Sequence, residues 1–188
     1  AIVGHDEYRE DVAQLIARGA DVLEMYHDLI SRDIVLAADV LRTVYETSGA
    51  RDGYVSIEVS PHLAYDAEGS IAEGRKLWMR LARPNVMIKV PATHAGLRAI
   101  QTLVAEGVNV NVTLLFGIAR YREVLDAWMM GLEQRLAADL PIGRCASVAS
   151  FFLSRIDTLV DRQLDSSGHT LPGHKTERLR GQAAIASA

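Results

Sequence analysis

The chain has 188 residues, of which 49% are hydrophobic, and its formal net charge at neutral pH is -4. This composition is typical of a folded globular protein and argues against a disordered or collagen-like chain. The 20 basic residues are interspersed with 24 acidic ones, so no basic surface for nucleic acid is predicted. No apolar run approaches the roughly 18–20 residues that a membrane span needs.

Cysteine and histidine content limits the chemistry further. Cys145 is the only cysteine, so an internal disulfide is excluded and a reducing compartment is natural. The first ten residues show neither the basic nor the apolar region of a secretory signal, and we expect a cytoplasmic protein. His169 and His174 lie in a polar loop without a third ligand nearby, so no metal site is expected there.

The first fifty residues are predicted to be helical. Apolar residues recur at three- and four-residue intervals between residues 21 and 48, and Gly49 is typical of a helix C-cap. Because this span is long for one helix, a break is expected near residues 31–33.

After residue 53, short β runs alternate with helical patterns. The predicted strands cover residues 54–59, 86–90, 108–116 and 146–154, and the predicted helices cover 68–82, 95–106, 118–138 and 156–165. This alternation predicts an α/β fold with parallel strands and right-handed helical crossovers. We expect a single domain over 1–188, with a helical segment at 1–50, four βα units at 54–165, and a loop and helix at 166–188.

Each predicted strand has one face that carries polar groups, because side chains alternate along a strand. These polar faces hold Ser56 and Glu58 on the first strand, Lys89 on the second, Asn111 and Thr113 on the third, and Ser150 and Ser154, beside Phe152, on the fourth. Val110, Val112 and Leu114 are expected together on the opposite face of the third strand. If adjacent strands align, the polar groups converge on one cavity.

Lys89 stands in the middle of the apolar run VMIKV, where a buried ammonium group is costly unless it is paired or used. A free lysine amine has a pKa near 10.4, and desolvation lowers that value by about 3. The neutral amine can attack a carbonyl to give a carbinolamine and then a Schiff base. Glu58 would move protons through a water that the Thr113 hydroxyl also holds.

Other interpretations of the same residues stay open. Lys89 also suits an edge strand or a side chain that reaches water, and Glu58 suits an ordinary ion pair with Lys89 that would oppose nucleophilicity. Asn111, Thr113 and Ser150 are each typical of hydrogen-bonded strand residues. The catalytic interpretation expects room for a water between Lys89 and Glu58.

Five stretches of the chain, taken together and in order, resemble transaldolase. They are SIEV at 56–59, NVMIKVPAT at 85–93, GLRAI at 96–100, NVNVTLLF at 109–116 and SVASFFLSRID at 147–157. The resemblance implies a parallel (β/α)8 TIM barrel of transaldolase type that is incomplete here, with four of its strands and N-terminal helices. The family's first strand, which carries an Asp acid/base, and its last two strands are not found in these residues. We therefore expect that the missing segments are supplied by complementing segments or by a homo-oligomer, or that this sequence is part of a longer chain.

The resemblance also implies an activity of the pentose phosphate pathway. A dihydroxyacetone unit would pass from a ketose phosphate (sedoheptulose 7-phosphate or fructose 6-phosphate) to an aldose phosphate through a lysine Schiff base. No metal or organic cofactor is expected, because the iminium is the electron sink. The resemblance implies that Lys89 forms the Schiff base and that Glu58 and Thr113 hold the catalytic water. Asn111 would bind substrate hydroxyls. Ser150 and Phe152 would line the substrate, and Arg155 would bind its phosphate.

Arg155 follows the last predicted strand, so it would sit at the C-terminal rim where barrel sites are built. Its planar guanidinium suits phosphate oxygens, although a surface arginine at a helix N-terminus is the alternative. Glu58 and Phe152 separate transaldolases from related fructose-6-phosphate aldolases, which typically carry Gln and Tyr there. Two other functions stay open: an aldolase that releases dihydroxyacetone, and a non-catalytic barrel fragment that binds sugar phosphates.

Overall fold

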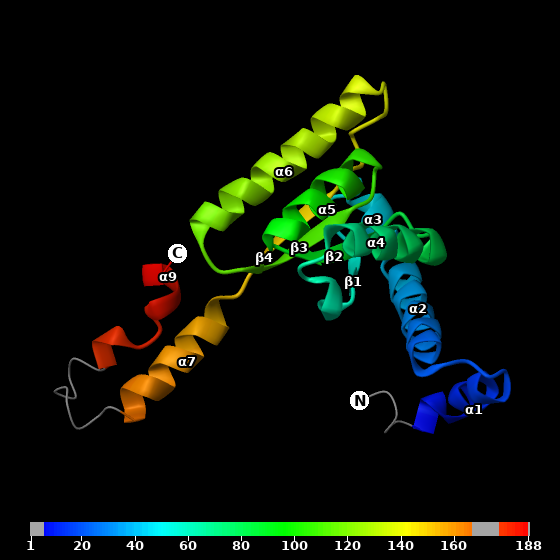
Figure 1. Cartoon of the computed structure of the whole chain (residues 1–188), viewed down its shortest axis with the longest axis horizontal. Coiled ribbons are helices and arrows are strands. Elements are labelled where there is room, and N and C mark those ends of the chain that lie inside the picture. Colours follow the sequence, from blue (N-terminus) through cyan, green and yellow to red (C-terminus); the bar gives the residue numbers. More distant parts are fainter. Residues whose placement is uncertain (1–5, 167–176, 188) are drawn as a thin grey trace. The chain divides into compact units, whose positions relative to one another are not determined.

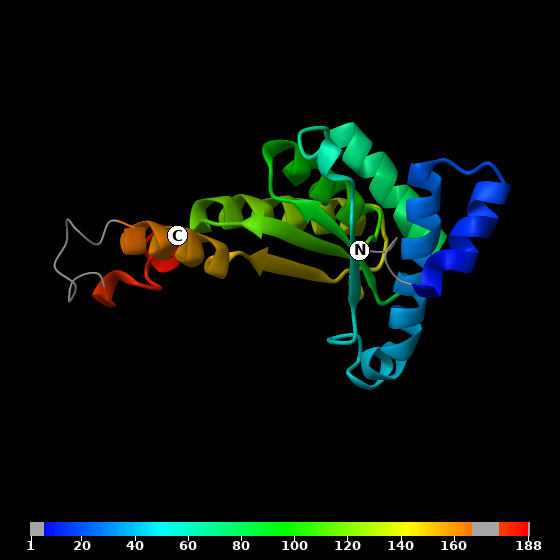
Figure 2. The ribbon, with the colours of Figure 1, turned by 90° about the horizontal axis from the view of Figure 1, so that it is seen from below.

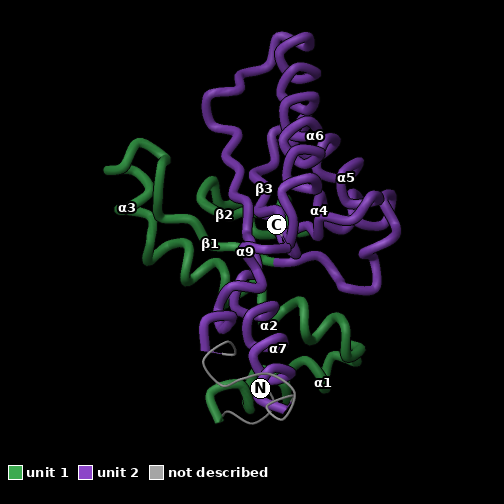
Figure 3. The backbone as a smooth tube through the Cα atoms, turned by 90° about the vertical axis from the view of Figure 1, so that its left-hand side faces the viewer, with its two compact units in different colours: residues 1–57, 76–87 green, residues 58–75, 88–188 purple. Residues whose placement is uncertain are grey.

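The computed structural model describes residues 6–166 and 177–187. The chain divides into two compact units: unit 1 is Ala1–Ile57 with Lys76–Met87, and unit 2 is Glu58–Arg75 with Ile88–Ala188 (Figure 3). Most of the predicted loop at the start of 166–188, with His169 and His174, lies outside the described residues. That 1–188 is one domain stays a prediction.

The N-terminal part of unit 1 is helical, as predicted, but its break falls elsewhere. A short 3-10 helix, η2 (Asp6–Tyr8), precedes α1 (Arg9–Ala17), α2 (Val22–Val40) and α3 (Arg42–Thr47). Asp21 and Glu24 form a capping box at the start of α2. The break expected near residues 31–33 is wrong, because α2 continues through them and ends before Leu41. Ser-Arg-Asp contains no glycine or proline to interrupt the helix, and Ser31 is buried within it.

The sheet has four strands in the order β1-β2-β3-β4, comprising β1 (Val55–Glu58), β2 (Val86–Pro91), β3 (Val110–Leu115) and β4 (Ser147–Phe151). β2 runs parallel to β3, and β3 runs parallel to β4. The helices that follow the strands are α4 (Ala67–Leu81), α5 (His94–Ala105), α6 (Ile118–Ala137) and α7 (Leu153–Ser166) (Figure 1). The predicted α/β alternation is confirmed, and the four strands with their helices are consistent with part of a TIM barrel.

In unit 2, α5 and α6 pack together and lie along the same side of β3 and β4 (Figure 2). Val110, Val112 and Leu115 on β3 are fully buried, as are Leu103 and Val104 on α5. The two helices approach closely at Gly131, where an added Cβ would lie 2.6 Å from the carbonyl oxygen of Gln101. This packing holds β3, the central strand of the unit, in place.

β4 is the last strand of the sheet, and every residue in it except Ser150 is exposed. The strand ends at Phe151, so the prediction of a strand to residue 154 is too long. Ser154 and Arg155 instead lie in the first turn of α7, which continues beyond the end of β4 (Figure 2). α7 packs against α9 (Ala183–Ser187), whose Ala184 amide donates to Asp157 at 2.9 Å.

No helix in the described part of the chain has both the length and the apolar character needed to cross a membrane.

Candidate active site

Lys89 and Glu58 meet across two neighbouring strands of the sheet. The Val59 amide donates a hydrogen bond of 3.1 Å to the Lys89 carbonyl, and this register sets Glu58 level with Lys89 on the neighbouring strand. The Nζ of Lys89 lies 3.3 Å from Oε2 of Glu58. The two side chains are 27% and 45% exposed, although every other residue of β2 is buried. The ion pair is therefore observed, and the expected room for a water between these two groups is wrong.

Asn111 on β3 stands level with Lys89 in the parallel register. Paired positions on adjacent strands direct their side chains to the same face, so Asn111 shares the face of Lys89. Its Oδ1 accepts a hydrogen bond of 2.8 Å from the Ser150 hydroxyl of β4. This bond ties the third strand to the fourth, and it fixes the orientation of the Asn111 amide.

Thr113 stands level with Pro91, two residues further along the same strand than Asn111. Its side chain is 1% exposed, and its hydroxyl has no hydrogen-bond partner among the described residues. A buried hydroxyl without a partner is uncommon, because desolvation then goes uncompensated. Such a group is suited to bind a water or a substrate atom.

The strand changes character directly after Thr113. Leu114 has a φ of +58°, and the pairing with β4 shifts between Val112 and Leu115. As a result Leu114 is 38% exposed, whereas Leu115 is fully buried. The expectation that Leu114 shares the buried face of Val110 and Val112 is wrong, because this bulge breaks the simple alternation of side chains.

Phe152 and Arg155 lie at the junction of β4 and α7. The Phe152 amide donates to the Leu115 carbonyl at 2.9 Å. The guanidinium carbon of Arg155 lies 4.3 Å from the centroid of the Phe152 ring, the geometry of a cation–π contact. The prediction that Arg155 follows a long strand is corrected, since it belongs to the first helical turn and is exposed.

The predicted site residues thus fall into three separate contacts, all within unit 2. These are the ion pair of Lys89 with Glu58, the hydrogen bond of Asn111 with Ser150 and the stack of Arg155 on Phe152, and the buried hydroxyl of Thr113 lies on the same strand as Asn111. Phe116, whose ring stacks on Phe152, was not among the predicted site residues. Its position at the end of the TLLF run, directly after β3, was the available signal.

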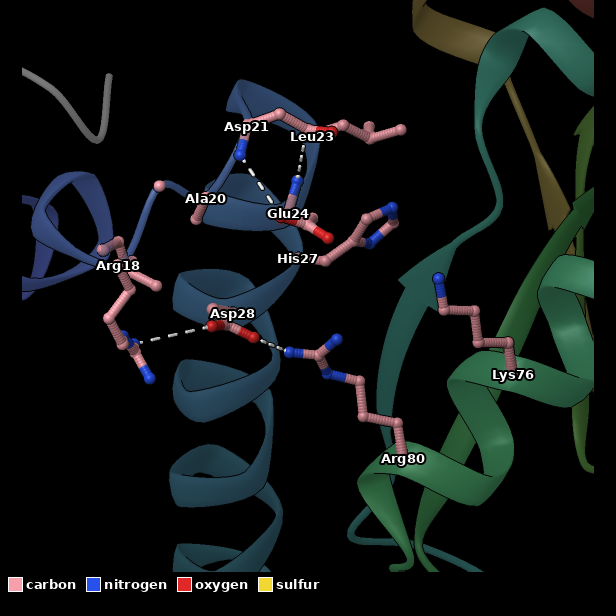
Figure 4. A pocket seen from close by; sticks show the side chains of 11 residues that line it. Arg18, Ala20, Asp21, Leu23, Glu24, His27, Asp28, Lys76 and Arg80 are labelled. Carbon is pink, nitrogen blue, oxygen red and sulfur yellow. Dashed lines mark hydrogen bonds and ion pairs between the residues drawn. The ribbon is translucent and has the colours of Figure 1, made fainter.

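A pocket of about 560 Å³ lies in unit 1 and contains none of the predicted site residues. Figure 4 shows Asp28 of α2 approached by both Arg18 and Arg80. The pocket is lined by three acidic side chains (Asp21, Glu24, Asp28) and three cationic ones (Arg18, Lys76, Arg80). Because the charges compensate and Asp21 and Glu24 are engaged in the helix cap, this pocket offers no excess charge for an ionic substrate.

Metal chemistry has no obvious site in the part of the chain that the structure covers. Within residues 6–166 and 177–187, no group of three or more His, Cys, Asp or Glu side chains is arranged to hold a metal ion.

Sequence comparisons identify the family and several relatives of the chain. The family model described as Transaldolase/Fructose-6-phosphate aldolase matches residues 1–188. A transaldolase of Saccharopolyspora erythraea is 50% identical over 182 residues, which are 97% of this chain and 48% of that protein. Transaldolase 1 of Streptomyces avermitilis is 47% identical over 100% of this chain and 49% of its own length.

A transaldolase of Mycolicibacterium paratuberculosis is 46% identical over 98% of this chain and 48% of its own length. The chain therefore spans about half the length of the curated relatives that it matches. Since the family model covers the sequence from its first residue to its last, the chain belongs to the transaldolase/fructose-6-phosphate aldolase family.

Proposed function

We propose that this chain carries the Schiff-base part of a transaldolase site, which transfers a dihydroxyacetone unit from a ketose phosphate to an aldose phosphate. The observation that carries the proposal is the position of Lys89, which is the one residue of β2 that is not buried and whose Nζ lies 3.3 Å from Glu58 on the neighbouring strand. The relatives named transaldolase support the same reaction, and the proposed substrates are sugar phosphates.

The first chemical step needs the neutral amine of Lys89. Glu58 is close enough to take a proton from the ammonium group directly, without an intervening water. The amine then forms a C–N bond with the ketose C2, and loss of water from the carbinolamine gives an iminium. The iminium accepts the electron pair of the breaking C3–C4 bond, so an enamine of three carbons remains on Lys89 and an aldose leaves. The proton of the C4 hydroxyl goes to a base, which the family resemblance places on its first strand.

The water released and consumed in these steps needs a polar anchor. The Thr113 hydroxyl is buried and without a partner among the described residues, which supports a role in holding that water. Asn111, oriented by Ser150, is suited to hydrogen-bond substrate hydroxyls with its amide. We propose that Ser150 and Phe152 line the substrate and that Arg155 binds the phosphate, because a guanidinium matches phosphate oxygens in pairs.

The exposed strand β4 supports the proposal that further protein covers this edge of the sheet, either as complementing segments or as a second copy. The length of the relatives, about twice that of this chain, favours the complementing segments. The single cysteine supports a reducing compartment, and we propose the cytoplasm.

Borohydride trapping tests the proposal. The chain is incubated with fructose 6-phosphate, reduced, digested and analysed by mass spectrometry. Its lysines are Lys76, Lys89 and Lys175, so an adduct is readily assigned. We expect it on Lys89 alone, absent in Lys89→Arg and retained in Lys76→Arg.

The adduct mass separates the functions. An adduct of three carbons shows C3–C4 cleavage, whereas one of the whole ketose phosphate shows binding without cleavage. Continuous release of dihydroxyacetone without an acceptor aldehyde would indicate an aldolase. A folded chain with no adduct on Lys89 would overturn the enzyme proposal in favour of a non-catalytic sugar-phosphate binder.

A further inference from the structure

Phe116 lies at the end of β3, in the connection that leads to α6, and its side chain is 41% exposed. Its ring centroid is 5.8 Å from that of Phe152, with an angle of 27° between the ring planes. This is an offset-stacked arrangement, which is favourable beyond the apolar area that it buries. The stack joins the end of the third strand to the end of the fourth.

The backbone places the two rings side by side. The bulge at Leu114 inserts a residue into β3, which lets Leu115 pair with Phe151 and present its carbonyl to the Phe152 amide. Phe116 and Phe152 are the residues that directly follow β3 and β4. The hydrogen bond between the Phe152 amide and the Leu115 carbonyl therefore holds the backbone that carries the two stacked rings.

The second partner of Phe152 is Arg155. The guanidinium carbon lies 4.3 Å from the ring centroid, and Arg155 has no ion-pair partner among the described residues. An exposed arginine has several freely rotating bonds and loses rotamer entropy when it is ordered. The cation–π contact with the Phe152 ring therefore favours one position of the Arg155 guanidinium.

We infer that Phe116 is a positioning residue for Arg155, acting through the Phe152 ring. By holding that ring, Phe116 limits where the guanidinium can stand, and so where an anionic phosphate group can bind. For a phosphorylated ketose, the position of Arg155 would set the distance between the bound phosphate and Lys89, and this consequence rests on the proposed function. The positioning of Arg155 by Phe116 does not depend on the proposed function.

The first test reads the position of Arg155 without any ligand. In the full 188-residue chain, we expect the ring current of Phe152 to shift the Nε–H resonance of Arg155, because the guanidinium lies over that ring. Phe116→Leu keeps apolar bulk and removes the ring, and we expect it to move this resonance toward its position in Phe152→Leu. Phe116→Tyr keeps the stack and should retain the wild-type resonance. Phe151→Ala is the matched control, because it removes a neighbouring ring that contacts Tyr121 instead.

The second test measures anion binding by titration with inorganic phosphate, followed at the same resonance. We expect Phe116→Leu to weaken binding roughly three-fold, with Phe116→Tyr and Phe151→Ala close to wild type. Where Lys89 is trapped, the half-saturating concentration of fructose 6-phosphate should rise by the same factor, and that of unphosphorylated dihydroxyacetone should not.

An unchanged Arg155 resonance and unchanged phosphate affinity in folded Phe116→Leu would overturn the inference. The same holds if Phe151→Ala has effects as large. Failure of trapping in the wild type, with the resonance and phosphate results as expected, would overturn the proposed function and leave the positioning of Arg155 established.

Discussion

The ammonium group of Lys89 and the carboxylate of Glu58 stand 3.3 Å apart, in direct contact across neighbouring strands. Attack on a carbonyl needs the neutral amine, and the Glu58 carboxylate is within reach to accept the proton of the ammonium group directly. Reaction with a carbonyl therefore requires the proton to leave Lys89 as the substrate enters. The contact makes Glu58 the first group to test.

Glu58→Gln should slow the borohydride-trapped adduct on Lys89 by about a hundred-fold, because the amide cannot take up the proton. The measurement is the rate of adduct formation by mass spectrometry at fixed fructose 6-phosphate. Glu68→Gln is the control, since that carboxylate pairs with exposed Arg98 at the surface and should leave the rate unchanged. Trapping at the wild-type rate in Glu58→Gln would exclude a proton-transfer role for this residue.

Ser150→Ala should lower the free energy of unfolding by about 1 kcal/mol, because the part-buried hydrogen bond to Asn111 is lost. Loss of this bond, which orients the Asn111 amide, should also raise the half-saturating ketose concentration in the trapping assay. Urea titration measures the first effect. Ser166→Ala, which removes an exposed hydroxyl bonded to a backbone carbonyl, should change stability by less than about 0.5 kcal/mol. Equal effects of the two substitutions would contradict a structural role for the Asn111 bond.

Gly96→Ala should destabilise the chain by about 2 kcal/mol or more, because the added methyl would fall on the backbone carbonyl oxygen of Pro91. The clash lies at the start of α5, where the Gly96 amide donates to the Thr93 side chain at 2.9 Å. Gly143→Ala is the matched control, since no heavy atom lies within 4 Å of its added Cβ. The midpoints of thermal and urea unfolding should fall for the first variant only, and a normal midpoint for Gly96→Ala would show that the turn can relax.

Asp39→Asn should weaken the dependence of stability on acidic pH. Hydrogen bonds from the Arg83 guanidinium, at 2.6 and 3.0 Å, hold the pKa of the Asp39 carboxyl below its ordinary value. A lowered folded-state pKa gives stability that is present above the unfolded-state value of about 4 and is lost as pH falls through the lower folded value. Between pH 5 and 2, the urea midpoint of the wild type should therefore fall more steeply than that of Asp39→Asn. Parallel curves would show that the pair does not contribute.

Local sequence pattern predicted the order of elements well. The run from 86 to 90 was predicted as a strand, and β2 covers Val86–Pro91 with Lys89 as its one residue that is not buried. The helix predicted at 95–106 differs from α5 by one residue at each end, and the helix predicted at 118–138 differs from α6 only by one residue at its C-terminal end. These segments were predictable because apolar spacing reports directly on which side of an element meets the core.

Features that depend on neighbouring strands were not predictable in the same way. The bulge at Leu114 arises in the pairing of β3 with β4, and the direct Lys89–Glu58 contact arises from how two strands align. In both cases the deciding partner lies far away in the sequence or in the packing around the segment. The break expected at residues 31–33 is a different kind of error, since these residues include no glycine or proline and α2 runs through them from Val22 to Val40.

By itself, the sequence determined the alternation of strands and helices, the residue types on the polar face of each strand, and the family. Only the tertiary structure decided that Glu58 touches Lys89, that Ser150 orients Asn111, and that Phe116 and Arg155 share the ring of Phe152. The physical reason is that periodicity is a property of one segment, whereas a distance between side chains depends on the register and packing of several.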